Sequence, residues 1–103
     1  GVTPDYTALT RLPRPKVCVS AADSTGRADF VSRLFAPAIG VNEDPVNGNS
    51  HTALTPYWGA KLAKERLIAH QASERGGVLR LHWRGDRVGI AGQAVIVMRG
   101  RLV

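Results

Sequence analysis

One stretch of this chain, residues 50–62, has the spacing of a long amphipathic helix, and strand-like segments surround it. Leu54, Trp58 and Leu62 recur there at intervals of four residues, with Tyr57 beside them. An apolar stripe of this width is buried against other elements, so we expect both aromatic side chains to lie in the core. A single central helix therefore limits the fold to one that covers this stripe with strands.

Prolines mark the expected ends of the helices. Pro56 falls inside the central stretch and predicts a kink, or a second helical segment capped by Thr55. Near the N-terminus, the run Thr3-Pro4-Asp5 is typical of a helix start, with Thr3 as the cap and the proline at the first helical position. That helix is short, because Pro13 cannot continue it.

About six segments are rich in β-branched and apolar residues and are separated by turn-forming residues. We infer an α+β fold in which a curved, mostly antiparallel sheet wraps around the central helix. The apolar run 94–98 needs strand partners on both sides, and an unpaired edge there invites pairing with another chain. The expected strands are residues 16–21, 28–35, 66–73, 78–84, 88–91 and 94–102.

The segment 40–51 precedes the helix and carries the residues with the clearest chemical potential. It contains two acidic residues, Glu43 and Asp44, and then turns into the helix, for which Asn49 or Ser50 is the expected N-cap. The first amides of a helix lack intrahelical partners and lie at its positive end, so they form a seat for an anion. The layout suits proton transfer on a small acid, although a loop of this composition also serves helix capping alone.

Size and charge narrow the classes of function. A chain of 103 residues forms one domain, and no apolar run reaches the ~18 residues of a spanning helix. The single cysteine, Cys18, lies in an apolar run, so we expect a buried free thiol and a reducing, cytoplasmic setting. The net charge of +6 arises after residue 60 and permits nucleic-acid binding. The bases alternate with apolar residues over 80–84, however, which favours a solvated strand face.

Four segments, in this order and spacing, resemble the second half of the phenazine-biosynthesis-type isomerases (PhzF-like proteins), which are related to diaminopimelate epimerase. The similarity extends from about Pro4 to Val103. The segments are Asp29-Phe-Val-Ser-Arg-Leu-Phe-Ala-Pro37, Gly40-Val-Asn-Glu-Asp-Pro-Val-Asn-Gly48, Gln71-Ala-Ser-Glu-Arg-Gly-Gly77 and Gly92-Gln-Ala-Val95.

The resemblance implies a protein of two lobes, each a curved sheet around a central helix, with the active site in the cleft between them. It implies acid–base chemistry without a metal, flavin or pyridoxal cofactor, performed by a glutamate of the first lobe and an aspartate of the second. Asp44 falls on that aspartate, and Gly48 and Asn49 fall on the helix-start positions whose amides hold the substrate carboxylate. Residues 1–103 thus resemble a single C-terminal lobe, with the N-terminal lobe and its glutamate absent.

One motif departs from the family pattern. The family usually reads Thr-Gly-Ser-Ala-His where this chain has Asn47-Gly-Asn-Ser-His51, so Asn49 supplies no hydroxyl at the serine position. We predict Asp44 as the catalytic residue. The predicted substrate-binding residues are Gly48, Asn49, Ser50, His51 and Arg75.

These residues leave three hypotheses. The first is the C-terminal half of an isomerase or epimerase that shifts a proton on a small carboxylate-bearing metabolite and is inactive as an isolated monomer, because acid–base catalysis needs both partners. The second is a homodimeric module, Asp44 facing Asp44, that binds a small acid without turnover. The third and weakest, nucleic-acid binding, rests on net charge alone. Glu43 is expected to be structural, paired with Arg33 or Arg75.

Overall fold

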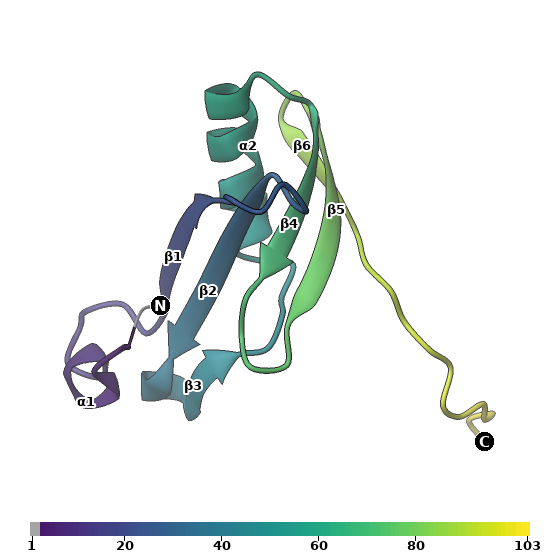
Figure 1. Cartoon of the computed structure of the whole chain (residues 1–103). Helices are drawn as coiled ribbons and strands as arrows, with labels where there is room; N and C mark the ends of the chain where they lie inside the picture. Colours follow the sequence, from purple (N-terminus) through teal and green to yellow (C-terminus); the bar gives the residue numbers. More distant parts are fainter. Residues whose placement is uncertain (1–2) are drawn as a thin grey trace.

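The computed structural model describes residues 3–103 and consists of one curved, unclosed sheet with a single long helix against one face (Figure 1). The strand order is β1-β2-β4-β5-β6, and β3 also pairs with β2. The expected α+β fold is therefore confirmed. The elements are α1 (Tyr6–Leu9), β1 (Val17–Ala22), β2 (Phe30–Ala36), the 3-10 turn η1 (Pro37–Ile39), β3 (Val41–Asp44), α2 (His51–Leu62), β4 (Arg66–Gln71), β5 (Gly77–Arg84) and β6 (Arg87–Ala91).

Strand β2 organises the sheet. One edge of β2 pairs antiparallel with the whole of β1, from Val17 opposite Phe35 to Ala22 opposite Phe30. The other edge is shared: its first half pairs parallel with the end of β4, and its second half pairs antiparallel with β3. Parallel strands need a long crossover, and here it contains α2. The ends of β3 and β4 consequently meet beside the middle of β2.

The core lies between α2 and the inner face of the sheet. Phe30 of β2 has no exposed surface, and its ring stacks on Trp58 of α2 at a centroid distance of 5.6 Å and an interplanar angle of 8°. Trp58 also donates from Nε1 to Ser20 Oγ of β1 at 3.1 Å, which ties the helix to the edge of the sheet. The remaining buried members of this cluster are Leu67, Ala69, Leu79 and Leu81.

Buried and more exposed residues alternate with a period of two in β4 and β5. In β5 the side chains of Leu79 and Leu81 are buried, whereas Arg80 and Arg84 are exposed. Arg80 is exposed between the buried Leu79 and Leu81 and therefore lies on the face of the sheet opposite the core. Among residues 3–103, neither helix lies over that face (Figure 1). The interpretation of the basic alternation as a solvated strand face is confirmed, because the cations lie opposite the core.

Three expectations for the helices are wrong in detail. Asp5, not Thr3, caps α1, because its side chain accepts from the Ala8 amide at 3.0 Å. Pro56 does not start a second segment capped by Thr55, since one helix spans residues 51–62, and the alternative, a kink at Pro56, stays a prediction. Tyr57 is 56% exposed and not in the core, because the stripe that meets the sheet is centred on Thr55, Trp58 and Gly59.

Three expectations for the sheet and its surroundings are also wrong. Cys18 is exposed, because β1 is an edge strand and α2 does not extend over it. The apolar segment 94–102 forms no strand: the chain leaves the sheet after β6 and runs away from it (Figure 1). Val95 and Val97 are 84% and 93% exposed. The segment 40–51 is also not wholly a loop, because its first part forms β3 beside β2.

Candidate active site at the start of helix α2

Asp44 ends β3, opposite Leu34 of β2, and is half-buried. Its Oδ1 accepts from the Val46 amide at 3.1 Å, and its Oδ2 accepts from Asn47 Nδ2 at 3.4 Å. The carboxylate is thus held over its own turn and directed toward the start of α2. Asp44 thus lies next to the helix start, as the sequence predicts.

Gln71 braces this turn from the sheet. It is the last residue of β4 and has no exposed surface. Its Nε2 donates to the Asp44 carbonyl at 3.0 Å, and its Oε1 accepts from the Asn47 amide at 3.0 Å. Because a buried unpaired amide or carbonyl costs ~1–3 kcal/mol, these two bonds fix the path of the backbone between Asp44 and Asn47.

Asn47, rather than Asn49 or Ser50, satisfies the first amide of the helix. Its Oδ1 accepts from the Ser50 amide at 3.3 Å and from Ser50 Oγ at 2.7 Å, while Ser50 itself occupies the N-cap position without a side-chain cap bond. The first helical amides are occupied too, so the expected row of free amides is shorter than predicted. The amides of His51, Thr52 and Ala53 donate to the carbonyls of Gly48, Asn49 and Ser50, at 3.0, 3.2 and 3.3 Å respectively.

Two amides stay open just ahead of that turn. Within residues 3–103, the backbone amides of Gly48 and Asn49 donate to no protein acceptor. They are consecutive, lie at the positive end of a helix of 12 residues and follow the turn that holds Asp44. Adjacent amides at such a terminus are suited to an anionic group, and these two are the amides at the helix start that have no acceptor within residues 3–103.

His51 anchors the helix start to the sheet. Its side chain is 0% exposed, its Nδ1 lies 2.8 Å from Asn47 O, and its Nε2 lies 3.4 Å from Ser32 Oγ of β2. The ring also stacks against Phe30 at 6.0 Å. Burial lowers the pKa of His51 below its ordinary value of 6.5, although the bond with the Asn47 carbonyl opposes this shift. His51 therefore reaches a ligand only through its neighbours.

The lowered pKa of His51 makes stability depend on pH. The unfolded chain takes up a proton near pH 6.5 that the folded protein resists, so the free energy of unfolding is largest above that value. It should fall as the pH drops toward the folded pKa and level off below it. Urea unfolding between about pH 7.5 and pH 5 measures this slope. His51→Gln should reduce the slope, whereas the control His82→Gln, on the outer strand face, should keep it; equal slopes in both variants would contradict the assignment.

Glu43 points the opposite way from Asp44, as consecutive residues of a strand do. Its carboxylate forms a bidentate pair with Arg33, with distances of 2.9 Å to Nε and 2.8 Å to Nη2. The predicted structural ion pair with Arg33 is confirmed. Arg75 takes no part in this pair.

Arg75 lies apart from the other predicted site residues. It lines a groove of about 630 Å³ on the Glu43 side of β3, together with Glu74 and Tyr6. Neither Asp44 nor the helix start lines this groove. Glu43 and Pro45, the two chain neighbours of Asp44, line this groove, and the Pro45 carbonyl accepts from Ser73 Oγ at 2.5 Å. The structure thus brings together Asp44, Gly48, Asn49, Ser50 and His51, and leaves Arg75 on the other side of the turn.

Two residues that brace the site were not among the predicted site residues: Asn47 and Gln71. Gln71 carried a detectable signal, because it continues the inward-facing positions of Leu67 and Ala69 and is the polar member of that series. Asn47 precedes Ser50 by three residues, a spacing that favours a side-chain cap. In the described part of the chain, no three His, Cys, Asp or Glu side chains converge to hold a metal ion.

Comparisons with known proteins agree with this architecture. A family model described as phenazine biosynthesis-like protein matches residues 1–100. An uncharacterized isomerase of Pseudomonas aeruginosa is 52% identical over 99 residues, which are 96% of this chain and 37% of that protein. A phenazine biosynthesis-like domain-containing protein 2 of mouse is 53% identical over 79 residues, 76% of this chain and 27% of that protein.

A solved structure is similar over nearly the whole chain. The crystal structure of a phenazine biosynthesis protein PhzF family member from Enterococcus faecalis superposes with a TM-score of 0.86 and 43% identity. The match covers 93% of this chain and 36% of that one. The chain therefore spans well under half the length of the relatives it matches.

Proposed function

Because this chain belongs to the phenazine biosynthesis-like protein family, we propose that it is the C-terminal lobe of a two-lobed isomerase. The complete protein would move a proton on a small carboxylate-bearing metabolite, with the first lobe supplying the opposing acid–base group. Residues 1–103 would form one domain of it. A chain that covers 37% of the Pseudomonas isomerase supports this division.

The observation that carries the proposal is the pair of open amides at Gly48 and Asn49 beside the Asp44 carboxylate. The amides would hold the carboxylate of the substrate. Asp44 would then face the adjacent carbon and orient or exchange its proton, which requires it to come within hydrogen-bond reach. Asn49 contributes its amide, so the absence of a serine hydroxyl at this position leaves the anion seat intact.

The remaining residues would act by positioning. Ser50 and His51 fix the angle at which the helix start meets the sheet, through Asn47 and Ser32. Arg75 would attract the anion from the far side of the turn without touching it. Acid–base isomerisation by these residues would use only groups of the protein and require no cofactor.

A single lobe provides only one member of the acid–base pair, so the isolated monomer should not turn over a substrate. No helix among residues 3–103 combines the length and apolar character that crossing a membrane requires. We further propose a reducing, cytoplasmic setting, which accommodates the unpaired Cys18.

The test uses a chimera in which the matched 96% of this chain replaces the matching 37% of the Pseudomonas isomerase. A panel of small carboxylic acids with an acidic C–H is incubated in D₂O, and deuterium incorporation is followed by mass spectrometry. We expect incorporation with the chimera and none with the 103-residue chain alone. Incorporation catalysed by a verified monomer of the isolated chain would overturn the proposal. A folded chimera inactive on every acid, beside an active parent, would also overturn it.

A further inference from the structure

The turn of residues 45–47, between β3 and the start of α2, forms no backbone–backbone hydrogen bond within residues 3–103. Side chains bond it instead. Gln71 bonds the turn at both ends, and Ser73 Oγ donates to the Pro45 carbonyl. Because backbone hydrogen bonds usually fix the path of a segment, the path of this turn depends on the side chains that replace them.

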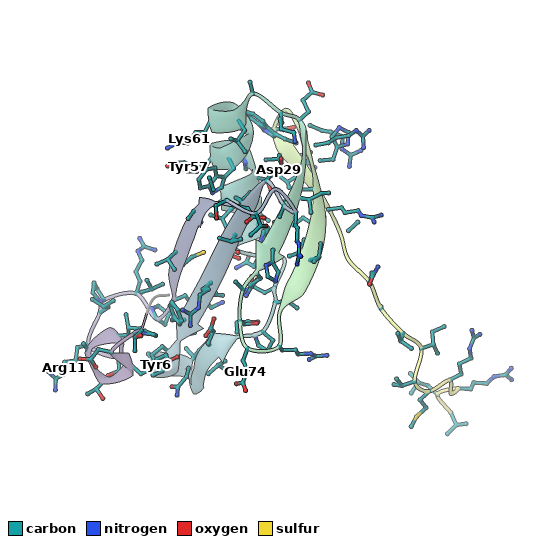
Figure 2. All side chains as sticks on the ribbon, viewed as in Figure 1. Tyr6, Arg11, Asp29, Tyr57, Lys61 and Glu74 are labelled. Atoms are coloured by element: carbon teal, nitrogen blue, oxygen red, sulfur yellow. The ribbon has the colours of Figure 1, made fainter. Side chains whose placement is uncertain are left out.

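These supports come from one hairpin, formed by β4 and β5. Gln71 ends β4, Ser73 lies in the hairpin turn, and Gly77 begins β5 directly opposite Gln71. The hairpin turn lies beside β3, where Glu74 lines the same groove as residues 42 and 43 (Figure 2). The hairpin therefore meets the segment that carries Asp44 along its whole length.

Gly77 supports the turn because it has no side chain. A Cβ at this position would lie 2.6 Å from the Cβ of Val46, which is closer than such atoms approach in proteins. Gly77 shares the inward face of β5 with the buried Leu79, since the two are separated by two positions. Val46 thus packs on the bare backbone of β5, and a side chain there would push the turn away from the sheet.

Asn47 is fixed on both of its peptide units. Its amide donates to Gln71 Oε1 at 3.0 Å, and its carbonyl lies 2.8 Å from His51 Nδ1. The Asn47 carbonyl and the Gly48 amide belong to one planar trans unit, so they point in opposite directions. The bond to His51 therefore directs the Gly48 amide away from the buried ring. At the other end of the turn, the Asp44 carbonyl accepts from Gln71 Nε2 at 3.0 Å.

We propose that Gln71 is a positioning residue, which sets the spacing between the Asp44 carboxylate and the Gly48 amide. Its one planar carboxamide bonds both ends of the turn, and we call these two bonds the clamp. Gln71 has no exposed surface, so it acts through the turn and not on the substrate. The role rests on the proposed function, in which both groups meet one substrate. A misplacement of about 1 Å between such groups costs about 100-fold in rate.

Gln71→Leu in the chimera removes both bonds and keeps most of the buried volume. We expect kcat/KM for deuterium incorporation to fall by about 100-fold, with a higher KM as well as a lower kcat, because the anion seat moves relative to the carboxylate. The matched control is Leu67→Ala, also buried and near the other end of β4, which should leave kcat/KM within about threefold while circular dichroism shows both variants folded. A folded Gln71→Leu chimera with the constants of the parent would overturn the proposal.

Gln71→Glu separates the two bonds from the size of the side chain. A protonated glutamic acid donates to the Asp44 carbonyl and accepts from the Asn47 amide, whereas the ionised form cannot donate. The rate relative to the parent should therefore rise as the pH falls from about 8.5 to about 5.5. Comparison with the parent at each pH corrects for Asp44 and His51, the ionisable residues that share these bonds. A relative rate as low at pH 5.5 as that of Gln71→Leu would mean that the clamp is not what Gln71 supplies.

Amide NMR of the 103-residue chain tests the clamp without any activity. Gln71→Leu and Gly77→Ala should both shift the amide signals of Asn47 and Gly48, and Gln71→Leu should speed hydrogen exchange at Asn47 by about tenfold or more. Gly92→Ala, whose added methyl meets nothing within 4 Å, should leave these signals unchanged. A parent chimera without activity would refute the isomerase function. Unchanged exchange at Asn47 in Gln71→Leu would refute the clamp, whatever the chimera does.

Discussion

Replacing Phe30 by alanine is expected to lower the free energy of unfolding by about 3–5 kcal/mol, the range for removing a fully buried aromatic side chain. Phe30 has no exposed surface and lies between Trp58 and His51, with ring centroids 5.6 and 6.0 Å away. Its loss would leave a cavity that the stacked rings of α2 cannot fill without moving the helix from the sheet. Urea unfolding monitored by the fluorescence of Trp58 and Trp83 and by circular dichroism measures the change.

The matched control is Ile68→Ala on β4. Ile68 lies on the outer face of the sheet, is 41% exposed and is flanked by the buried Leu67 and Ala69. Its truncation should cost less than about 1.5 kcal/mol, because 41% of its surface stays in water after folding, whereas Phe30 has none. Equal losses for Phe30→Ala and Ile68→Ala would mean that α2 does not cover the core as described. Phe30→Leu should fall between the two, since it retains part of the buried volume.

Replacing Asp44 by asparagine in the chimera is expected to reduce the rate of deuterium incorporation by about 10²–10⁴-fold, the usual contribution of a positioned acid–base group. Asparagine keeps the shape of the side chain and an oxygen that accepts from the Val46 amide, and it loses the longer bond that Asp44 Oδ2 accepts from Asn47 Nδ2 at 3.4 Å. The turn should keep its conformation, because the Val46 bond and both Gln71 bonds remain. The loss should therefore appear in kcat more than in KM. Amide chemical shifts of Gly48 and Asn49 would show whether the anion seat survives the substitution.

Glu43→Gln is the matched control, because Glu43 is the preceding acidic residue of the same strand and faces the other side. Its carboxylate pairs with Arg33, so glutamine should lower stability modestly and leave the rate of exchange within about threefold of the parent. A chimera with Asp44→Asn that keeps full activity would show that this aspartate only caps its turn. The same loss in both variants would point to damage of β3 instead.

Much of the fold follows from patterns within the sequence. Strand β5 alternates apolar and polar residues, so both its type and its inward face are predictable, and the spacing over residues 50–62 predicts the helix α2. The exposure of Tyr57 and Cys18 is not predictable from the sequence, because it depends on the sheet ending at β1. The segment 94–102 has the composition of a strand, but composition does not supply the partner that a strand needs.

Likewise, only part of the candidate site can be predicted from the sequence. The adjacency of Asp44 and the helix start follows from a short chain separation and from the capping preferences of the residues between them. The hydrogen bonds from Gln71 cannot be predicted in this way, because Gln71 is distant in sequence. It meets Asp44 only because β3 and β4 share one edge of β2. For the same reason, the sequence alone does not show that Arg75, four residues after Gln71, lies outside the site that it adjoins.

The shared edge of β2 bears on the order in which the lobe assembles. Strands β1 and β2 form an antiparallel hairpin, and β4, β5 and β6 form a second antiparallel unit from neighbouring segments. The parallel contact of Phe30, Val31 and Ser32 with the end of β4 joins the two units, and its crossover runs through β3 and α2. Contacts that close long chain segments form late. Docking of α2 between two preformed hairpin units is thus the step that we expect to set the speed of folding, and stopped-flow refolding of Trp58 variants would time it.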